Sequence, residues 1–117
     1  MTTMELLQKT RAAWPRLSTA PAEEKDRLLR AMADALEEHI PAILQANRQD
    51  MEDAAGHISA VMLDRLRLDE GRIRAMAEGI RAAAALPDHT GRVLTQLTRP
   101  NGMTIAKVQV PLGLVAI

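Results

Sequence analysis

The sequence predicts a protein of the α/β class: a mainly α-helical stretch, then a β-hairpin, then the first strand of a parallel sheet. Composition is the first observation behind this prediction. Residues 1–91 are rich in Ala, Leu, Met, Glu and Arg, which favour helices, whereas residues 92–117 are rich in Val, Thr, Ile and Leu, with Pro and Gly between the runs. The charge changes at the same position, because residues 1–91 hold 12 basic and 15 acidic residues and residues 92–117 hold three basic residues and no acid.

The overall counts exclude several classes of protein. The chain has 117 residues, 15 basic and 15 acidic side chains, and no cysteine. Its length suits one domain of ordinary size, and a net charge of zero argues against nucleic-acid or membrane-surface binding, which usually needs a basic excess. No apolar run approaches the roughly 20 residues of a membrane span, and Met1–Glu5 shows no secretory signal. We therefore expect a soluble cytoplasmic protein without disulfides, thiolate metal sites or a cysteine nucleophile in these residues.

Two helices are expected in the first forty residues. The first runs from about Thr3, a possible N-cap, to Ala13, because Trp14-Pro15 disfavours a helical residue before the proline. The second starts near Pro21, a residue type suited to the first helical turn, and ends at Ile40-Pro41. Apolar residues at helical spacing give the second helix a buried stripe, namely Leu29, Met32, Ala33, Leu36 and Ile40.

Two further helices and a short helical piece follow. The third helix covers about residues 41–55 and stops at Gly56. The short piece follows Ser59, and the fourth helix begins after Asp69, a good N-cap, and is closed by Leu86-Pro87. The apolar residues expected to face inward are Met62, Leu63 and Leu66 in the short piece, and Ile73, Met76, Ala77, Ile80 and Ala84 in the fourth helix.

Residues 92–98 and 103–110 are expected to form a β-hairpin. Asn101-Gly102 between two β-rich runs is a strong hairpin signal, and Pro100 indicates a loop longer than two residues. The apolar run 114–117 is then typical of a strand buried on both faces, as in a parallel sheet covered by helices. Because no other segment offers it a parallel partner, we expect the chain to be a fragment of a larger α/β protein.

Residue types that carry chemistry are present, but they are not arranged as a known site. His39, His57 and His89 lack the spacing of a helical metal site, and no glycine pattern indicates a phosphate-binding loop. The carboxylates on polar helix faces are expected to face solvent, and the arginines of the fourth helix alternate with acids and so form no anion-binding patch. These carboxylates are Glu37, Glu38, Asp50 and Asp53, and these arginines are Arg72, Arg74 and Arg81.

Two positions leave alternatives open. Asn47 lies on an apolar helix face, where it either orients a ligand or, in the interpretation we favour, is buried and caps a neighbouring backbone group. Asp64-Arg65 either holds a charged substrate or, in the favoured interpretation, takes part in a surface or inter-helix ion pair. From the residues alone we assign no catalytic, cofactor-binding or metal-binding residue.

Four stretches of the chain carry a family resemblance, namely residues 24–29, 43–50, 62–68 and 110–117. The distinctive elements are Ala46-Asn47-x-x-Asp50 and Met62-Leu63-Asp64-Arg65-Leu66-x-Leu68, whereas Pro111-Leu112-Gly113 is more widely shared. In order and spacing the chain resembles the N-terminal part of the gamma-glutamyl phosphate reductase (glutamate-5-semialdehyde dehydrogenase) family, in the aldehyde dehydrogenase superfamily. The resemblance covers the whole chain but only about the first quarter to third of a family member.

The resemblance implies an NADPH-dependent reduction of L-glutamyl 5-phosphate to L-glutamate 5-semialdehyde, with release of phosphate and NADP+, in proline biosynthesis. In such a reaction a Cys thiolate attacks the acyl phosphate, and a hydride then reduces the thioester. Because this chain has no cysteine, we expect it to be inactive by itself and to act as scaffold and subunit contact. The resemblance implies a homo-oligomer and no nucleic-acid or membrane partner.

The resemblance also implies a division of the chain within an aldehyde dehydrogenase-like fold. Residues 1–91 are expected to be helices packed on the cofactor domain, residues 92–110 the hairpin of an oligomerisation sheet, and residues 111–117 the start of the dinucleotide-binding sheet. Two alternatives stay open: another member of the aldehyde dehydrogenase superfamily with a different acyl substrate, and a stand-alone helical interaction module with a C-terminal hairpin.

Overall fold

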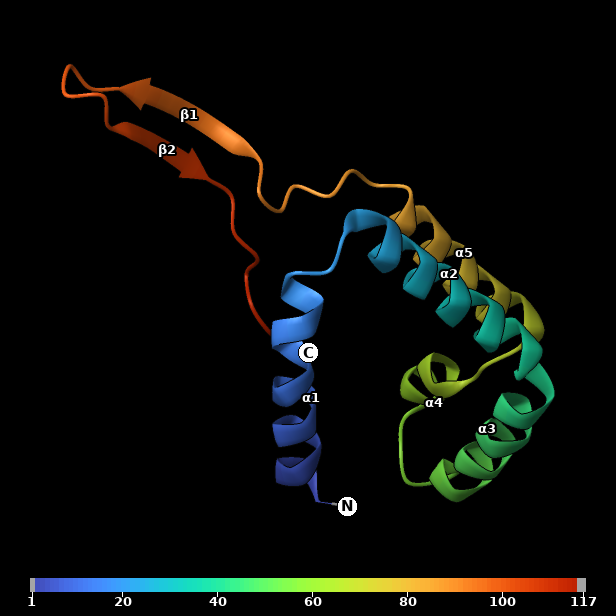
Figure 1. Ribbon diagram of the computed structural model, residues 1–117. Coiled ribbons are helices and arrows are strands. Elements are labelled where there is room, and N and C mark those ends of the chain that lie inside the picture. Colours follow the sequence, from blue (N-terminus) through green and yellow to red (C-terminus); the bar gives the residue numbers. More distant parts are fainter. Residues whose placement is uncertain (1, 116–117) are drawn as a thin grey trace. The chain divides into compact units, whose positions relative to one another are not determined.

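The computed structural model describes residues 2–115, which form five helices and one two-stranded antiparallel sheet (Figure 1). In chain order the elements are α1 (Thr3–Ser18), α2 (Ala22–Glu38), α3 (Ile40–Ala54), α4 (Ala60–Leu66), α5 (Glu70–Ala84), β1 (Val93–Thr98) and β2 (Thr104–Val108). Glu23–Leu86 forms one compact unit, and the chain on either side of it forms the other. The prediction of a mainly helical chain with a C-terminal hairpin is therefore confirmed for the part of the chain described.

The helical unit has a small core where α2 and α5 lie side by side (Figure 1). Ala33 of α2 and Ala77 of α5 are fully buried, and Ile73 of α5 is exposed by only 1%. Small side chains at a helix contact allow the two backbones to approach closely. Helix α3 contacts both α4 and α5, and its Ile40 is buried, whereas α4 contributes no buried residue.

Local capping signals set several helix boundaries as the sequence predicts. The Ser59 hydroxyl accepts a hydrogen bond from the Met62 N–H at 3.3 Å, and the Asp69 carboxylate accepts one from the Arg72 N–H at 2.7 Å. Each side chain satisfies one of the free N–H groups in the first turn of its helix. The expected starts of α4 and α5 are therefore confirmed.

Helix α1 begins at Thr3 as predicted, but its N-cap and its C-terminal end differ from the prediction. Its N-cap is Thr2, which forms a reciprocal capping box with Glu5, and the helix continues through Pro15 to Ser18 instead of ending near Ala13. The Ser18 hydroxyl donates to the Pro15 carbonyl oxygen at 2.9 Å. The missing N–H of Pro15 frees one acceptor, the Arg11 carbonyl oxygen, and because α1 has no buried residue this oxygen can face water, so the helix continues past the proline.

Three methionines expected in the core lie on the surface instead. Met32 of α2, Met62 of α4 and Met76 of α5 are exposed by 57%, 50% and 49%. The apolar stripe of each helix is wider than the surface that its neighbours cover, because the short helices of this unit provide few partners. The inward orientation predicted for these three side chains is wrong in this structure.

The hairpin pairs β1 with β2 through a loop that includes Pro100 and Asn101-Gly102. Thr98 pairs with Thr104 and Leu97 with Ile105, and the Arg99 N–H donates to the Met103 carbonyl oxygen at 2.8 Å. Gly102 has φ of 83°, a left-handed conformation that favours glycine. The predicted hairpin is confirmed, with the longer loop that Pro100 indicates.

Residues 111–115, which follow the hairpin, adopt no regular secondary structure. The apolar run expected to begin a parallel sheet includes Ala116 and Ile117, which lie outside the described residues. A parallel strand needs a neighbouring strand to bond with, and β1 and β2 pair only with each other in the described sheet. The assignment of residues 111–117 to a dinucleotide-binding sheet stays a prediction.

Candidate functional site

The histidines and carboxylates do not gather into a metal centre in residues 2–115. His39 lies between α2 and α3, with its Nδ1 2.8 Å from the Ala35 carbonyl oxygen, whereas His57 and His89 lie outside the helices and strands. The helices described are also too short or too polar to cross a membrane.

Asn47 is the one buried polar residue of the described chain, exposed by 7%. Its Nδ2 donates to the Leu66 carbonyl oxygen at 2.9 Å, and its Oδ1 accepts from the Leu68 N–H at 2.8 Å. The amide thus holds both sides of the segment where α4 ends, which confirms the favoured interpretation of this residue. Its polar atoms are directed to the backbone and not to a ligand.

Arg72 also binds the segment where α4 ends. Its guanidinium donates to the carbonyl oxygens of Asp64 and Arg67 at 2.6 and 2.7 Å and lies 3.3 Å from an Asp64 carboxylate oxygen. Asp64 therefore forms the inter-helix ion pair favoured above, with Arg72 as its partner. The sequence alone did not identify this partner, because the two residues are separated by the loop between α4 and α5.

Arg81 of α5 is the centre of an ion cluster that joins α5 to α2. It lies 2.7 Å from carboxylate oxygens of both Asp34 and Glu37 and 2.8 Å from Glu78. The hydrogen bond with Arg81 holds the pKa of Glu37 below its ordinary value, and the three carboxylates, Glu37 first, raise the pKa of Arg81. Glu37 was expected to face solvent, but its side chain is exposed by only 28% and is ion-paired, so that expectation is wrong.

The cluster continues to Arg74, which lies 2.6 Å from Glu70 and 3.8 Å from Glu37. The hydrogen bond with Glu70 raises the pKa of Arg74. Because carboxylates already neutralise Arg74 and Arg81, neither guanidinium is available to bind an anionic substrate. The i,i+3 spacing of Glu78 and Arg81 is a signal in the sequence for one of these ion pairs. The contacts of Arg81 with α2, however, join residues 47 and 44 positions apart.

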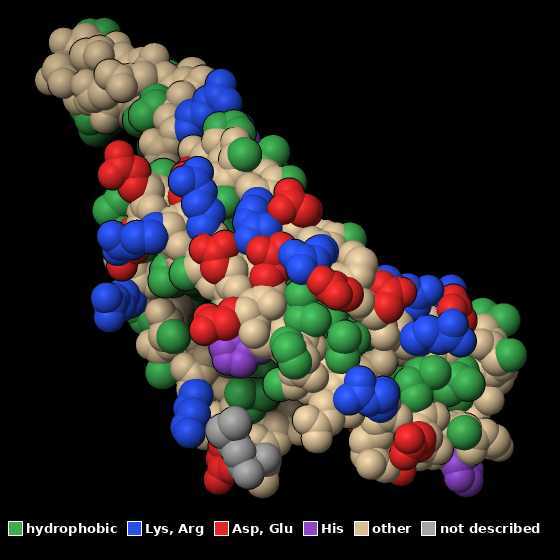
Figure 2. All heavy atoms as spheres, turned by 90° about the vertical axis from the view of Figure 1, so that its right-hand side faces the viewer, with side chains coloured by type: hydrophobic (Ala, Val, Ile, Leu, Met, Phe, Trp, Pro, Cys, Tyr) green, Lys and Arg blue, Asp and Glu red, His purple; other side chains and the backbone are tan. Residues whose placement is uncertain are grey.

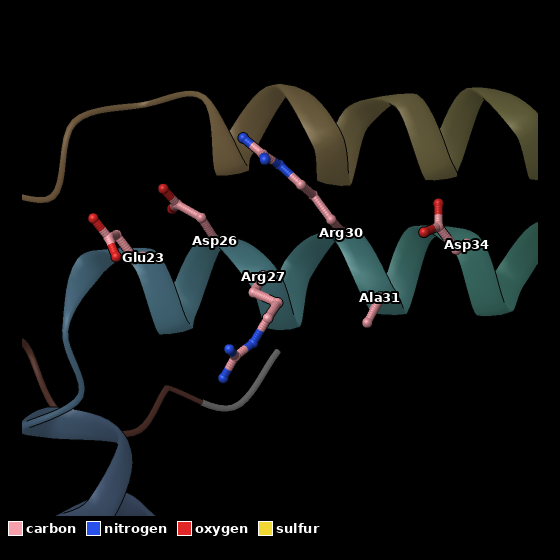
Figure 3. A pocket seen from close by; sticks show the side chains of 6 residues that line it. All are labelled: Glu23, Asp26, Arg27, Arg30, Ala31 and Asp34. Carbon is pink, nitrogen blue, oxygen red and sulfur yellow. The ribbon is translucent and has the colours of Figure 1, made fainter.

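A hollow on α2 gathers charged side chains of both signs (Figure 3). Six residues line it, namely Glu23, Asp26, Arg27, Arg30, Ala31 and Asp34. All come from one helix, and Arg27 and Arg30 point to opposite sides of it in Figure 3. Three carboxylates beside two diverging guanidiniums do not form a pocket for a phosphate group. Acidic and basic side chains also alternate on the face shown in Figure 2, where no patch has a single sign.

A second hollow within the helical unit is almost entirely apolar. It is lined by Met32, Ala35, Leu36, His39, Ile43 and Ile80, from α2, α3 and α5 and the residue between α2 and α3. Met32 is exposed by 57%. An apolar surface beside an ion cluster is typical of a helix pair that packs against another element on one side and faces water on the other.

The hairpin is the other exposed apolar surface. Every residue of β1 and β2 is exposed, and an isolated two-stranded sheet is marginally stable in water. The large apolar side chains that it presents are Val93, Leu94, Leu97, Met103, Ile105 and Val108. The described residues thus offer two surfaces suited to packing and no cluster suited to catalysis.

Comparison with known proteins gives a consistent result, although no family model matches the chain. The gamma-glutamyl phosphate reductase of Neisseria meningitidis serogroup C is 52% identical over 98% of this chain, which covers 27% of that protein. The enzyme of the same name from Brucella anthropi is 47% identical over 97% of this chain and 27% of its own length. The chain therefore spans about a quarter of the length of the relatives that it matches, and the resemblance found in the sequence is confirmed.

Solved structures give the same result for the fold. The crystal structure of gamma-glutamyl phosphate reductase from Thermotoga maritima matches with a TM-score of 0.87 and 35% identity, over 92% of this chain and 26% of that chain. The Saccharomyces cerevisiae enzyme of that name matches with a TM-score of 0.76 and 29% identity, over 95% of this chain and 29% of its own. The observed elements thus match part of a gamma-glutamyl phosphate reductase fold.

Proposed function

We propose that this chain forms part of a gamma-glutamyl phosphate reductase, an NADPH-dependent enzyme that reduces L-glutamyl 5-phosphate to L-glutamate 5-semialdehyde in proline biosynthesis. The observation that carries the proposal is the match to enzymes of that name along nearly the whole chain, in sequence and in fold. The enzyme is assigned to the aldehyde dehydrogenase superfamily and to the cytoplasm.

The chemistry of this reaction sets what the chain can contribute. Reducing an acyl phosphate to an aldehyde requires a nucleophile that displaces phosphate from the acyl carbon and a hydride donor that reduces the resulting acyl intermediate. The chain contains no cysteine, so it does not supply the thiolate. Its part in the enzyme is therefore structural.

We assign no NADPH-binding residue within residues 2–115. The dinucleotide carries several phosphate charges, and such groups need converging N–H donors or free cations. The charged hollow on α2 has more carboxylates than guanidiniums, and Arg74 and Arg81 are engaged by carboxylates. No catalytic step is assigned to residues 2–115.

The two exposed apolar surfaces indicate the structural role. The hollow that includes Met32, Ile43 and Ile80 supports packing of residues 1–91 against the cofactor domain of the enzyme. The exposed hairpin supports a place for residues 92–110 in an oligomerisation sheet, and hence a homo-oligomeric enzyme. Residues 111–117 are assigned to the start of the dinucleotide-binding sheet.

A chimeric enzyme tests the proposal. This chain is placed in the Neisseria meningitidis reductase in exchange for the matched segment of that enzyme. A bacterial strain that lacks the reductase and carries the chimera is expected to grow without added proline, as it does with the unaltered enzyme. A chimera that accumulates as soluble protein but does not restore growth would contradict the proposal. The 117-residue chain alone, as a matched control, is expected not to restore growth.

A further inference from the structure

We draw no further inference here: the strongest candidate, the apolar hollow of the helical unit that includes Met32, Ile43 and Ile80, is an unpartnered face, and nothing in the part of the chain that the structure describes shows what covers it.

Discussion

Replacing Asn47 by alanine is expected to destabilise the helical unit by about 2–3 kcal/mol. The substitution removes two hydrogen bonds, to the Leu66 carbonyl at 2.9 Å and from the Leu68 N–H at 2.8 Å. Each such bond contributes about 1 kcal/mol net, and leaving a half-buried backbone group without a partner raises the cost further. With the side chain exposed by only 7%, water does not readily replace the amide. Urea unfolding followed by circular dichroism at 222 nm measures the change in free energy.

Two further variants separate the hydrogen bonds from the side-chain volume. Asn47→Asp retains an acceptor for the Leu68 N–H but sets a carboxylate oxygen against the Leu66 carbonyl, so it should also destabilise the unit, while the Leu68 amide stays protected from hydrogen exchange. Gln45→Ala, at an exposed position of the same helix, is the control and should change stability by less than about 0.5 kcal/mol. If Asn47→Ala costs no more than Gln45→Ala, or leaves Leu68 protection unchanged, the reasoning about this amide is wrong.

Three other predictions concern charge and backbone conformation. The stability that Glu37 contributes is present above the ordinary glutamate pKa of 4.5 and is lost as pH falls through the lowered pKa of the folded state. The urea midpoint of the unaltered chain should therefore fall on acidification, and that of Glu37→Gln should fall less. Equal pH profiles of the two proteins would refute this. Gly79→Ala, on α5 with open space around the added Cβ, should stabilise the chain by about 0.5–1 kcal/mol in urea unfolding; destabilisation would contradict the observed environment. Gly102→Ala should weaken the hairpin by about 1 kcal/mol, because its φ of 83° strains alanine; unchanged cross-strand nuclear Overhauser effects between Thr98 and Thr104 at elevated temperature would argue against it.

The elements that depended on local chemistry could be predicted from the sequence. Ser59 and Asp69 cap their helices because a short polar side chain needs to reach only three residues along the chain. Asn101-Gly102 marks the hairpin through equally local chemistry. The loop needs a left-handed backbone at residue 102, and glycine adopts that conformation without strain. The predicted end of α1 was wrong because the rule considers only the local effect of Pro15. The helix continues to Ser18 because the backbone hydrogen bonds of its other turns hold it.

The contacts that depended on distant residues could not be predicted. Arg81 reaches Asp34 and Glu37 across 47 and 44 residues of sequence, and only the packing of α5 on α2 brings them together. Asn47 was the exception, because a polar residue on an apolar stripe needs a hydrogen-bond partner wherever the fold places it. The assignment to a reductase came from the resemblance, since these residues contain no arrangement that indicates the reaction by itself.

The rate of NADPH oxidation by the purified chimera, with L-glutamyl 5-phosphate as substrate, tests the central claim most directly. If this chain is part of a gamma-glutamyl phosphate reductase, the chimera should retain kcat within about tenfold of the unaltered Neisseria enzyme, a change of about 1.4 kcal/mol in activation free energy. The 117-residue chain alone should give no turnover. A folded chimera that binds NADPH but does not oxidise it with this substrate would contradict the account.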